Sequence, residues 1–250
     1  MPAPSDLTDA ERVLYDAFPR GTAVDLRDAT DRAVRATVIR SLLLGAHEAE
    51  AGQLPALRLI GARITGRLHL AYAEVLCSVR FEHCEFELPM DFYGVRMRRL
   101  TLTDSAFPGF LASTAAIDGN LQITRCRSAG QIRLIGARIN GTLILNGSQL
   151  TSSDIALQAT RLAVGNDILA RKGFSCTGRL DLNNADVGGS IRLEGAQLSH
   201  PGETALSALD LRVGAIVNCC DGFRSDGAVP TGTAPFAFMR SRRIDKLICL

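Results

Sequence analysis

Apolar residues recur from Leu57 onward at fixed offsets of an eleven-residue frame. In the first frame, residues 57–64, apolar or small side chains stand at offsets 0, 2, 5 and 7. Further frames begin at Leu68, Val79, Met90, Ile132, Leu143, Leu180 and Ile191. Internal repetition on this scale indicates a repeat architecture, in which one structural unit stacks on the next.

A longer repeat is superimposed on the short one. Residues 130–177 align with residues 178–226, which makes units of 48 and 49 residues. Both units carry an insertion at the same place, near residues 152–154 and 199–203. We interpret these insertions as loops that protrude from a regular stack.

The frame has a direct structural meaning. Offsets 0 and 2 are two inward positions on one short strand, and the side chain between them points outward. A corner follows, and offsets 5 and 7 lie on the next strand. Two frames make one coil, which buries its inward residues against the coils above and below. The pattern therefore predicts an all-β solenoid, a right-handed quadrilateral parallel β-helix with about 22 residues per coil and about eight coils. The frame is unassigned between Arg98 and Asn120.

The first 52 residues have a different period. Thr8 and Glu11 form a capping-box pattern, which predicts a helix with Val13, Leu14 and Phe18 as its apolar stripe. Apolar residues at helical spacing predict a second helix from about residue 30 to about residue 45. We therefore expect an N-terminal α-helical cap at 1–52 and a solenoid at 53–250, with a degenerate C-terminal tail after Asp226.

Several motifs resemble those of known families. Inward pairs of the type small-x-Leu on square coils resemble pentapeptide-repeat proteins. The runs VRATVIRSLLLG at 34–45, GARITGRL at 61–68 and DGFR at 221–224 are similar to a group of actinobacterial proteins labelled "membrane-associated oxidoreductase". The resemblance covers residues from about 8 to 228. It implies the solenoid fold and, through the label alone, an accessory enzyme of specialised metabolism; it implies no catalytic residue.

Charge is unevenly placed but nowhere extreme. Residues 1–52 carry a net charge of −3 and residues 53–250 carry +5. Nucleic-acid binding proteins show a stronger basic bias, so we expect no nucleic-acid partner. No stretch reaches the roughly 18 apolar residues of a membrane helix. The N-terminus lacks the basic and apolar regions of a signal peptide. We therefore expect a cytoplasmic protein without a transmembrane segment.

Motifs for cofactors and metals are absent from the sequence. The glycines stand at coil corners, and no glycine-rich loop joins a strand to a helix as a phosphate site requires. No C-x-x-C pair occurs among the seven cysteines. Cys84 and Cys126 occupy a slot that Ala fills elsewhere, so we interpret them as small buried residues. The alternative is a metal site formed by Cys77, His83 and Cys84, which we consider the weaker interpretation. We expect no cofactor, no metal and no catalytic residue.

The candidate binding residues lie at outward positions. His69 and Asp91 fall in one column on successive coils, where they could pair for acid–base chemistry or form a solvated surface pair. Arg58, Arg80 and Arg192 share a face if the coil parity holds, and Arg133 joins them if the frame slips by half a coil. Such a column can bind phosphate, carboxylate or an acidic protein surface.

These patterns favour a non-enzymatic binding or scaffold protein that uses the flat faces of a solenoid for protein interaction. One alternative is a DNA mimic that protects a topoisomerase, although a mimic must carry negative charge along its length. The other is the accessory oxidoreductase that the family label implies. Apolar residues near the C-terminus predict a homodimer joined end to end, or else a tail that folds over the last coil.

Overall fold

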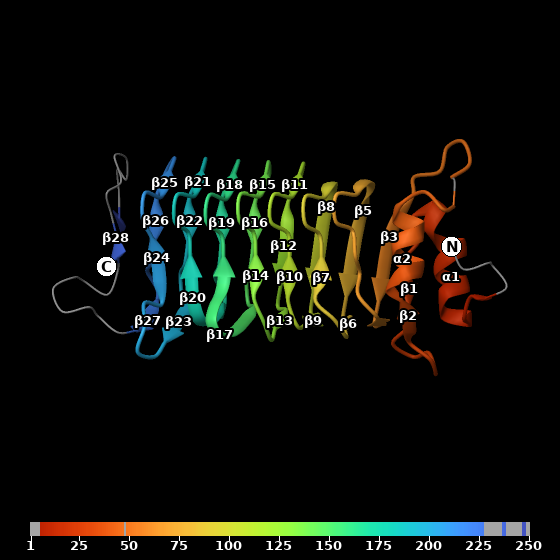
Figure 1. The fold of residues 1–250 in the computed structure, drawn as a ribbon, viewed down its shortest axis with the longest axis horizontal. Helices are drawn as coiled ribbons and strands as arrows, with labels where there is room; N and C mark the ends of the chain where they lie inside the picture. The colour runs from red at the N-terminus through yellow and green to blue at the C-terminus, as the bar shows by residue number, and fades with distance from the viewer. Residues whose placement is uncertain (1–5, 48, 228–236, 239–246, 249–250) are drawn as a thin grey trace.

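The computed structural model describes residues 6–47 and 49–227 and the two short strands at 237–238 and 247–248. The chain forms a long rod, in which helices close the N-terminal end and parallel strands follow one another along the axis (Figure 1). About seven turns of roughly 22 residues build the rod, so the predicted β-solenoid is confirmed.

The strands form four faces, which appear as four rows in Figure 1. Four long strands pass round a corner and belong to two faces each. These are β5 (Glu74–Glu82) and β8 (Arg96–Thr103), which run from face 4 to face 1, and β17 (Gln149–Gln158) and β20 (Ser175–Asp181), which run from face 2 to face 3.

The other strands belong to one face each. Face 1 also contains β1 (Val24–Asp25), β3 (Ala56–Ile60), β12 (Leu121–Thr124), β16 (Leu143–Ile144), β19 (Ile168–Leu169), β22 (Ile191–Arg192), β26 (Val217–Asn218) and β29 (Leu247–Ile248). Face 2 also contains β2 (Ala33–Arg35), β4 (Arg63–Thr65), β6 (Glu85–Phe86), β9 (Ala106–Phe107), β13 (Arg127–Ser128), β23 (Gln197–His200) and β27 (Arg224–Gly227). Face 3 also contains β7 (Met90–Asp91), β10 (Phe110–Leu111), β14 (Ile132–Arg133), β24 (Leu206–Ala208) and β28 (Ala237–Phe238). Face 4 also contains β11 (Ala116–Ile117), β15 (Arg138–Ile139), β18 (Ala163–Val164), β21 (Asp186–Val187) and β25 (Arg212–Val213).

The strand register assigns the repeat frame between Arg98 and Asn120, which the sequence left open. Leu100 pairs with Val79 below it and with Leu121 above it, so each of these two coils takes 21 residues instead of 22. The insertions lengthen two later coils, because Leu143 pairs with Ile168 and Ile191 with Val217, which lie 25 and 26 residues on. The structure has about seven turns, so the predicted number of eight is corrected.

Small residues alternate with large ones in the core. The corner slot at offset 5 holds Cys84, Ser105, Cys126 and Ser148, and all four are buried. Ser105 is satisfied, because its Oγ accepts from the Cys84 amide at 3.0 Å and donates to the Thr103 carbonyl at 2.8 Å. Burial raises the pKa of Cys84 to about 12 and that of Cys126 to about 11. The prediction that both cysteines are small core residues is confirmed.

Two opposite corners of the coil require a left-handed backbone. Glycine supplies it at several coils, for example at Gly61 (φ 72°) and Gly136 (φ 62°). Among the described residues, ten other coil corners place a side-chain-bearing residue there: Tyr72, His83, Asp104, Thr114, Arg125, Arg161, Lys172, Asn184, Asp210 and Asp221. The predicted corner glycines Gly141 and Gly189 serve another purpose, because a Cβ there would approach the backbone of the preceding coil within 3.0 Å.

The N-terminal cap contains α1 (Asp9–Ala17), a 3-10 turn η2 (Phe18–Arg20) and α2 (Ala36–Leu43). The capping box of Thr8 and Glu11 is present as predicted. The second helix begins later than predicted, because residues 33–35 form β2, which pairs with β4. Since β1 also pairs with β3, the strand ladder begins inside the segment predicted to be only a helical cap.

At the other end the chain adds two backbone strands to the stack. β28 pairs with β24, and β29 pairs with β26. The rest of the predicted apolar tail, including Phe236 and Cys249, lies outside the described residues. No helix within the described part of the chain is long and apolar enough to cross a membrane.

Candidate functional site

The structure pairs His69 with Asp91 on face 3. The two residues form an isolated parallel bridge, and His69 Nδ1 lies 2.8 Å from Asp91 Oδ2. Asp91 Oδ1 also accepts from the Tyr93 amide at 3.2 Å, while Arg40 Nε from α2 donates to the His69 carbonyl at 3.0 Å. The half-exposed imidazole is therefore oriented by a carboxylate, an arrangement that can relay a proton or bind a donor.

The structure places Arg58, Arg80 and Arg192 on one face, as the coil parity predicted, but it does not bring all three together. Arg58 and Arg80 are direct neighbours on face 1. Arg192 lies on the same face, but the column between carries Thr101, Gln122, Ile144 and Leu169. Arg133 lies on face 3, where Leu111 stands between it and Asp91. The frame does not slip by half a coil, so Arg133 joins the His69 column instead.

A larger group of arginines surrounds Arg58 and Arg80. Strand β8 presents Arg96, Arg98 and Arg99, all exposed, as it turns from face 4 to face 1. Arg99 pairs with Ser78 of β5, two residues before Arg80. We call this group the arginine patch; its members are Arg58, Arg80, Arg96, Arg98 and Arg99.

Sequence reasoning missed three members of the arginine patch. The frame was unassigned from Arg98 onward, so the positions of Arg98 and Arg99 relative to Arg80 were unknown. The run Arg96-Met97-Arg98-Arg99 was the available signal, because it places three arginines within four residues beside a buried methionine.

Some arginines elsewhere on the rod, among them Arg27 and Arg125, are neutralised by carboxylates. Arg125 binds Asp104 through two hydrogen bonds of 2.7 and 2.6 Å, and Arg27 binds Asp25 in the same manner. Hydrogen bonds from Arg125 lower the pKa of Asp104, and those from Arg27 lower the pKa of Asp25 to about 2. In both pairs the arginine charge is already matched by a carboxylate within the chain.

The arginine patch differs from those pairs. Its one ion pair within the described residues joins Arg80 Nε to Glu82 at 3.0 Å. The other four guanidinium groups make no hydrogen bond or ion pair to the described residues. Their charge and their donors are therefore available to a ligand, since a guanidinium carries five N–H donors and stays charged at physiological pH.

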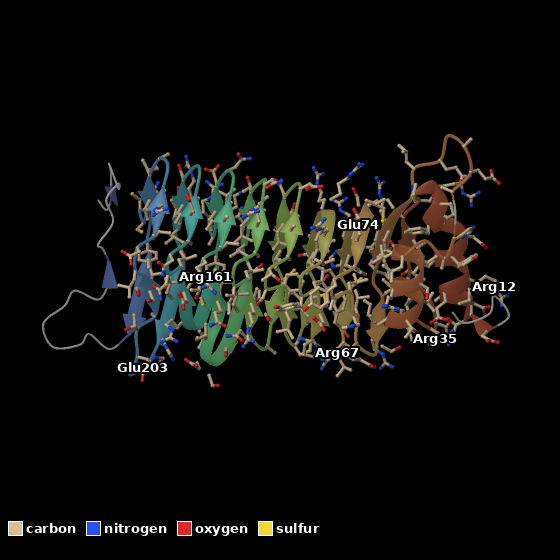
Figure 2. The ribbon with its side chains drawn as sticks, turned by 45° about the horizontal axis from the view of Figure 1, so that its top comes forward. Arg12, Arg35, Arg67, Glu74, Arg161 and Glu203 are labelled. Atoms are coloured by element: carbon tan, nitrogen blue, oxygen red, sulfur yellow. The ribbon has the colours of Figure 1, made fainter. Side chains whose placement is uncertain are left out.

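A shallow hollow of about 360 Å³ adjoins the arginine patch on face 4. Val75, Met97 and Ala116 belong to its lining, together with the outward residues Glu74, Leu76, Arg96, Arg98 and Asp118. Figure 2 shows Glu74 in the N-terminal half of the rod, on the strands next to the cap. The hollow therefore offers cations, carboxylates and one exposed apolar side chain, that of Leu76, side by side.

Metal chemistry finds no support in this arrangement. Within the described part of the chain, no three His, Cys, Asp or Glu side chains gather as a metal site would require. Cys84 faces the core, away from the exposed His83, so the residues once considered for a metal do not converge.

Comparisons with protein families, curated proteins and solved structures gave no match to this chain. The coils are consistent with a pentapeptide-repeat-like fold. Because one fold hosts many functions, the function has to be argued from the surfaces themselves.

Proposed function

We propose that this chain is a non-enzymatic binding protein whose arginine patch binds an acidic surface of a protein partner. The observation that supports the proposal most directly is the gathering of five arginines on adjoining strands, four of which make no ion pair with the described residues. The arginines elsewhere that are held by Asp or Glu provide the contrast, since their charge is already satisfied within the chain.

The scaffold suits this task. Neighbouring strands of a sheet lie about 4.8 Å apart, so the arginines of β3, β5 and β8 are held at a fixed spacing. Arginine recognises carboxylates through paired hydrogen bonds, which adds geometry to charge. A partner with carboxylates at matching intervals would find a preformed surface, and its approach would be accelerated by the local positive potential.

The sign of the patch also weighs against the DNA-mimic alternative. A mimic competes with DNA by presenting a rod of negative charge. The exposed cations of the arginine patch present the opposite sign. The same surface would attract the acidic partner that we propose.

The proposal is tested with an oligoglutamate peptide carrying a fluorophore, measured by anisotropy at low and physiological salt. We expect binding by the native chain and a loss of affinity of about tenfold or more in the double variant Arg96→Glu/Arg99→Glu. The matched control is Arg138→Glu/Arg212→Glu, which makes the same charge change at exposed residues of face 4 beyond the patch.

The control separates a defined site from general attraction. Equal losses in the two double variants would mean that only net charge matters, and this would overturn the proposal. No binding by the native chain at low salt would overturn it as well. Circular dichroism of each variant establishes that the substitutions at these exposed positions leave the solenoid intact.

A further inference from the structure

Two strongly exposed leucines stand beside the arginine patch. Leu54 is 81% exposed and Leu76 is 74% exposed. Ala56 pairs with Ser78, and each leucine precedes its member of this pair by two residues. The two leucines therefore mark the same corner of the rod, between faces 4 and 1, on successive coils.

Single exposed leucines are common on protein surfaces and need no explanation. These two are set apart by their surroundings. Leu76 shares the hollow with Arg96 and Arg98, and Leu54 precedes β3, the strand that carries Arg58. An apolar group ringed by charged side chains is the usual arrangement of a binding surface, where the centre excludes water and the rim pairs charges.

The carboxylates of the hollow narrow the class of ligand. Glu74 and Asp118 line it together with the arginines. An anionic lipid surface or a nucleic acid would be repelled by these two carboxylates, because both present negative charge throughout. A polypeptide can place carboxylates on the arginines and backbone N–H groups or a basic residue on Glu74 and Asp118. The mixed lining therefore favours a peptide.

We infer that the partner contributes an acidic segment that carries an apolar side chain, and that this side chain packs against Leu54 and Leu76. Carboxylates on either side of it bind the arginine patch. The inference rests on the proposed function and adds to it the second determinant of recognition, an apolar anchor next to the charges.

The test is a double-mutant cycle across the interface. The protein is used as the native chain and as the variant Leu54→Ala/Leu76→Ala. Each is titrated with two labelled oligoglutamate peptides, one with a central leucine and one with alanine at that place. We expect the native chain to prefer the leucine peptide by about tenfold, and the variant to bind both peptides equally.

Leu209→Ala is the matched control, since Leu209 is another exposed leucine at the far end of the rod. It should keep the full preference for the leucine peptide. A preference that survives in the Leu54→Ala/Leu76→Ala variant, or that the native chain lacks, would overturn the apolar anchor. The proposed function is tested separately: it would be overturned by equal losses of oligoglutamate affinity in the two arginine double variants.

Vesicles containing phosphatidylserine and a single-stranded oligonucleotide serve as competitors. The choice of a peptide would be overturned if vesicles or oligonucleotide displaced the leucine peptide at a lower concentration of negative charges than unlabelled oligoglutamate needs, and if this displacement depended on Leu54 and Leu76. Weaker displacement by both would support it.

Discussion

At the scale of single residues, the solenoid depends on the contrast between inward and outward slots. Leu134 is fully buried between coils, whereas Arg138, four residues later, is exposed and has no partner among the described residues. Each inward slot touches the same slot of the coils above and below. A substitution at an inward slot therefore disturbs the packing of three coils, whereas a substitution at an outward slot changes only a side chain that contacts solvent.

We expect Leu134→Asp to prevent soluble expression, because it places an unpaired charge in the stacked core. Arg138→Asp is the control, since it puts the same side chain at an outward slot. Expression yield and circular dichroism are the measurements. A folded, soluble Leu134→Asp chain would contradict the assignment of inward slots.

The corner residues differ in how well they tolerate a left-handed backbone. Thr114 and Asn184 occupy the same left-handed corner on different coils, with φ of 56° and 56°, and both are exposed. A β-branched residue is strained in this region, whereas asparagine tolerates it.

Exchanging the two residue types should therefore act in opposite directions. We expect Thr114→Asn to raise the free energy of unfolding by about 1 kcal/mol and Asn184→Thr to lower it by about the same amount. Thermal or urea unfolding of the two variants measures this. Shifts of the same sign would contradict the account of the corners.

At the scale of elements, an ion pair between a buried carboxylate and a partly exposed arginine joins the first helix to the strand ladder. Glu11 of α1 is fully buried and accepts from the Arg35 backbone amide at 2.9 Å and from Arg35 Nε at 2.8 Å. It also accepts from the Thr8 amide at 3.1 Å. A single carboxylate thus caps α1 and fixes the end of β2.

This ion pair makes a prediction about pH. Burial raises the pKa of Glu11, but the hydrogen bonds from Arg35 and Thr8 and the charge of Arg35 outweigh it, so the pKa is lowered. The pair therefore stabilises the fold at neutral pH, and that contribution is lost as the pH falls below about 4.3 and through the lowered folded-state pKa.

We expect Glu11→Gln to destabilise the fold at pH 7 by about 2 kcal/mol, since it removes the charge but keeps the shape. The difference between the native chain and the variant should shrink as the pH falls. Urea unfolding at several pH values measures it. A difference that is constant from pH 7 to acid would show that the charge of Glu11 contributes nothing.

At the scale of the whole molecule, the two ends of the rod need protection. An open coil exposes unpaired strand edges and the apolar interior, which invites association. At the N-terminus, β1 and β2 pair with β3 and β4, and the helices lie beyond them (Figure 1). Because both the edge and the interior are covered there, the cap is an integral part of the fold.

Deletion of residues 1–50 should therefore give oligomers or inclusion bodies, because it removes both terminal strands together with both helices. Size-exclusion chromatography with light scattering measures the outcome. A monodisperse truncated chain that unfolds at the same temperature as the full chain would contradict a capping role.

The C-terminal end carries the prediction of a homodimer. Apolar residues follow the repeat there, and two copies could join their last coils about a two-fold axis. We expect light scattering to give twice the 26.8 kDa of one chain. A monomer at every concentration would contradict this, and would agree with the alternative in which the tail, including β28 and β29, continues the stack.

What the sequence determined by itself is the local geometry. Side chains alternate across a strand and glycine favours tight corners, so the frame from Leu57 to Ile64 predicted the solenoid and its inward slots. The capping box of Thr8 and Glu11 predicted α1 for the same reason: the interacting atoms belong to neighbouring residues. The His69–Asp91 pair also followed, because one coil of regular length separates its members.

Tertiary structure alone decided which distant columns align. A coil of 21 residues or an insertion shifts everything above it, so the sequence could not place Arg133 beside the His69 column or Arg99 beside Arg80. It also could not show that β8 continues round a corner, which brings Arg96, Arg98 and Arg99 to one surface. Left-handed corners at residues such as Thr114 were equally hidden, because the neighbouring coils, and not the residue's own preference, impose them.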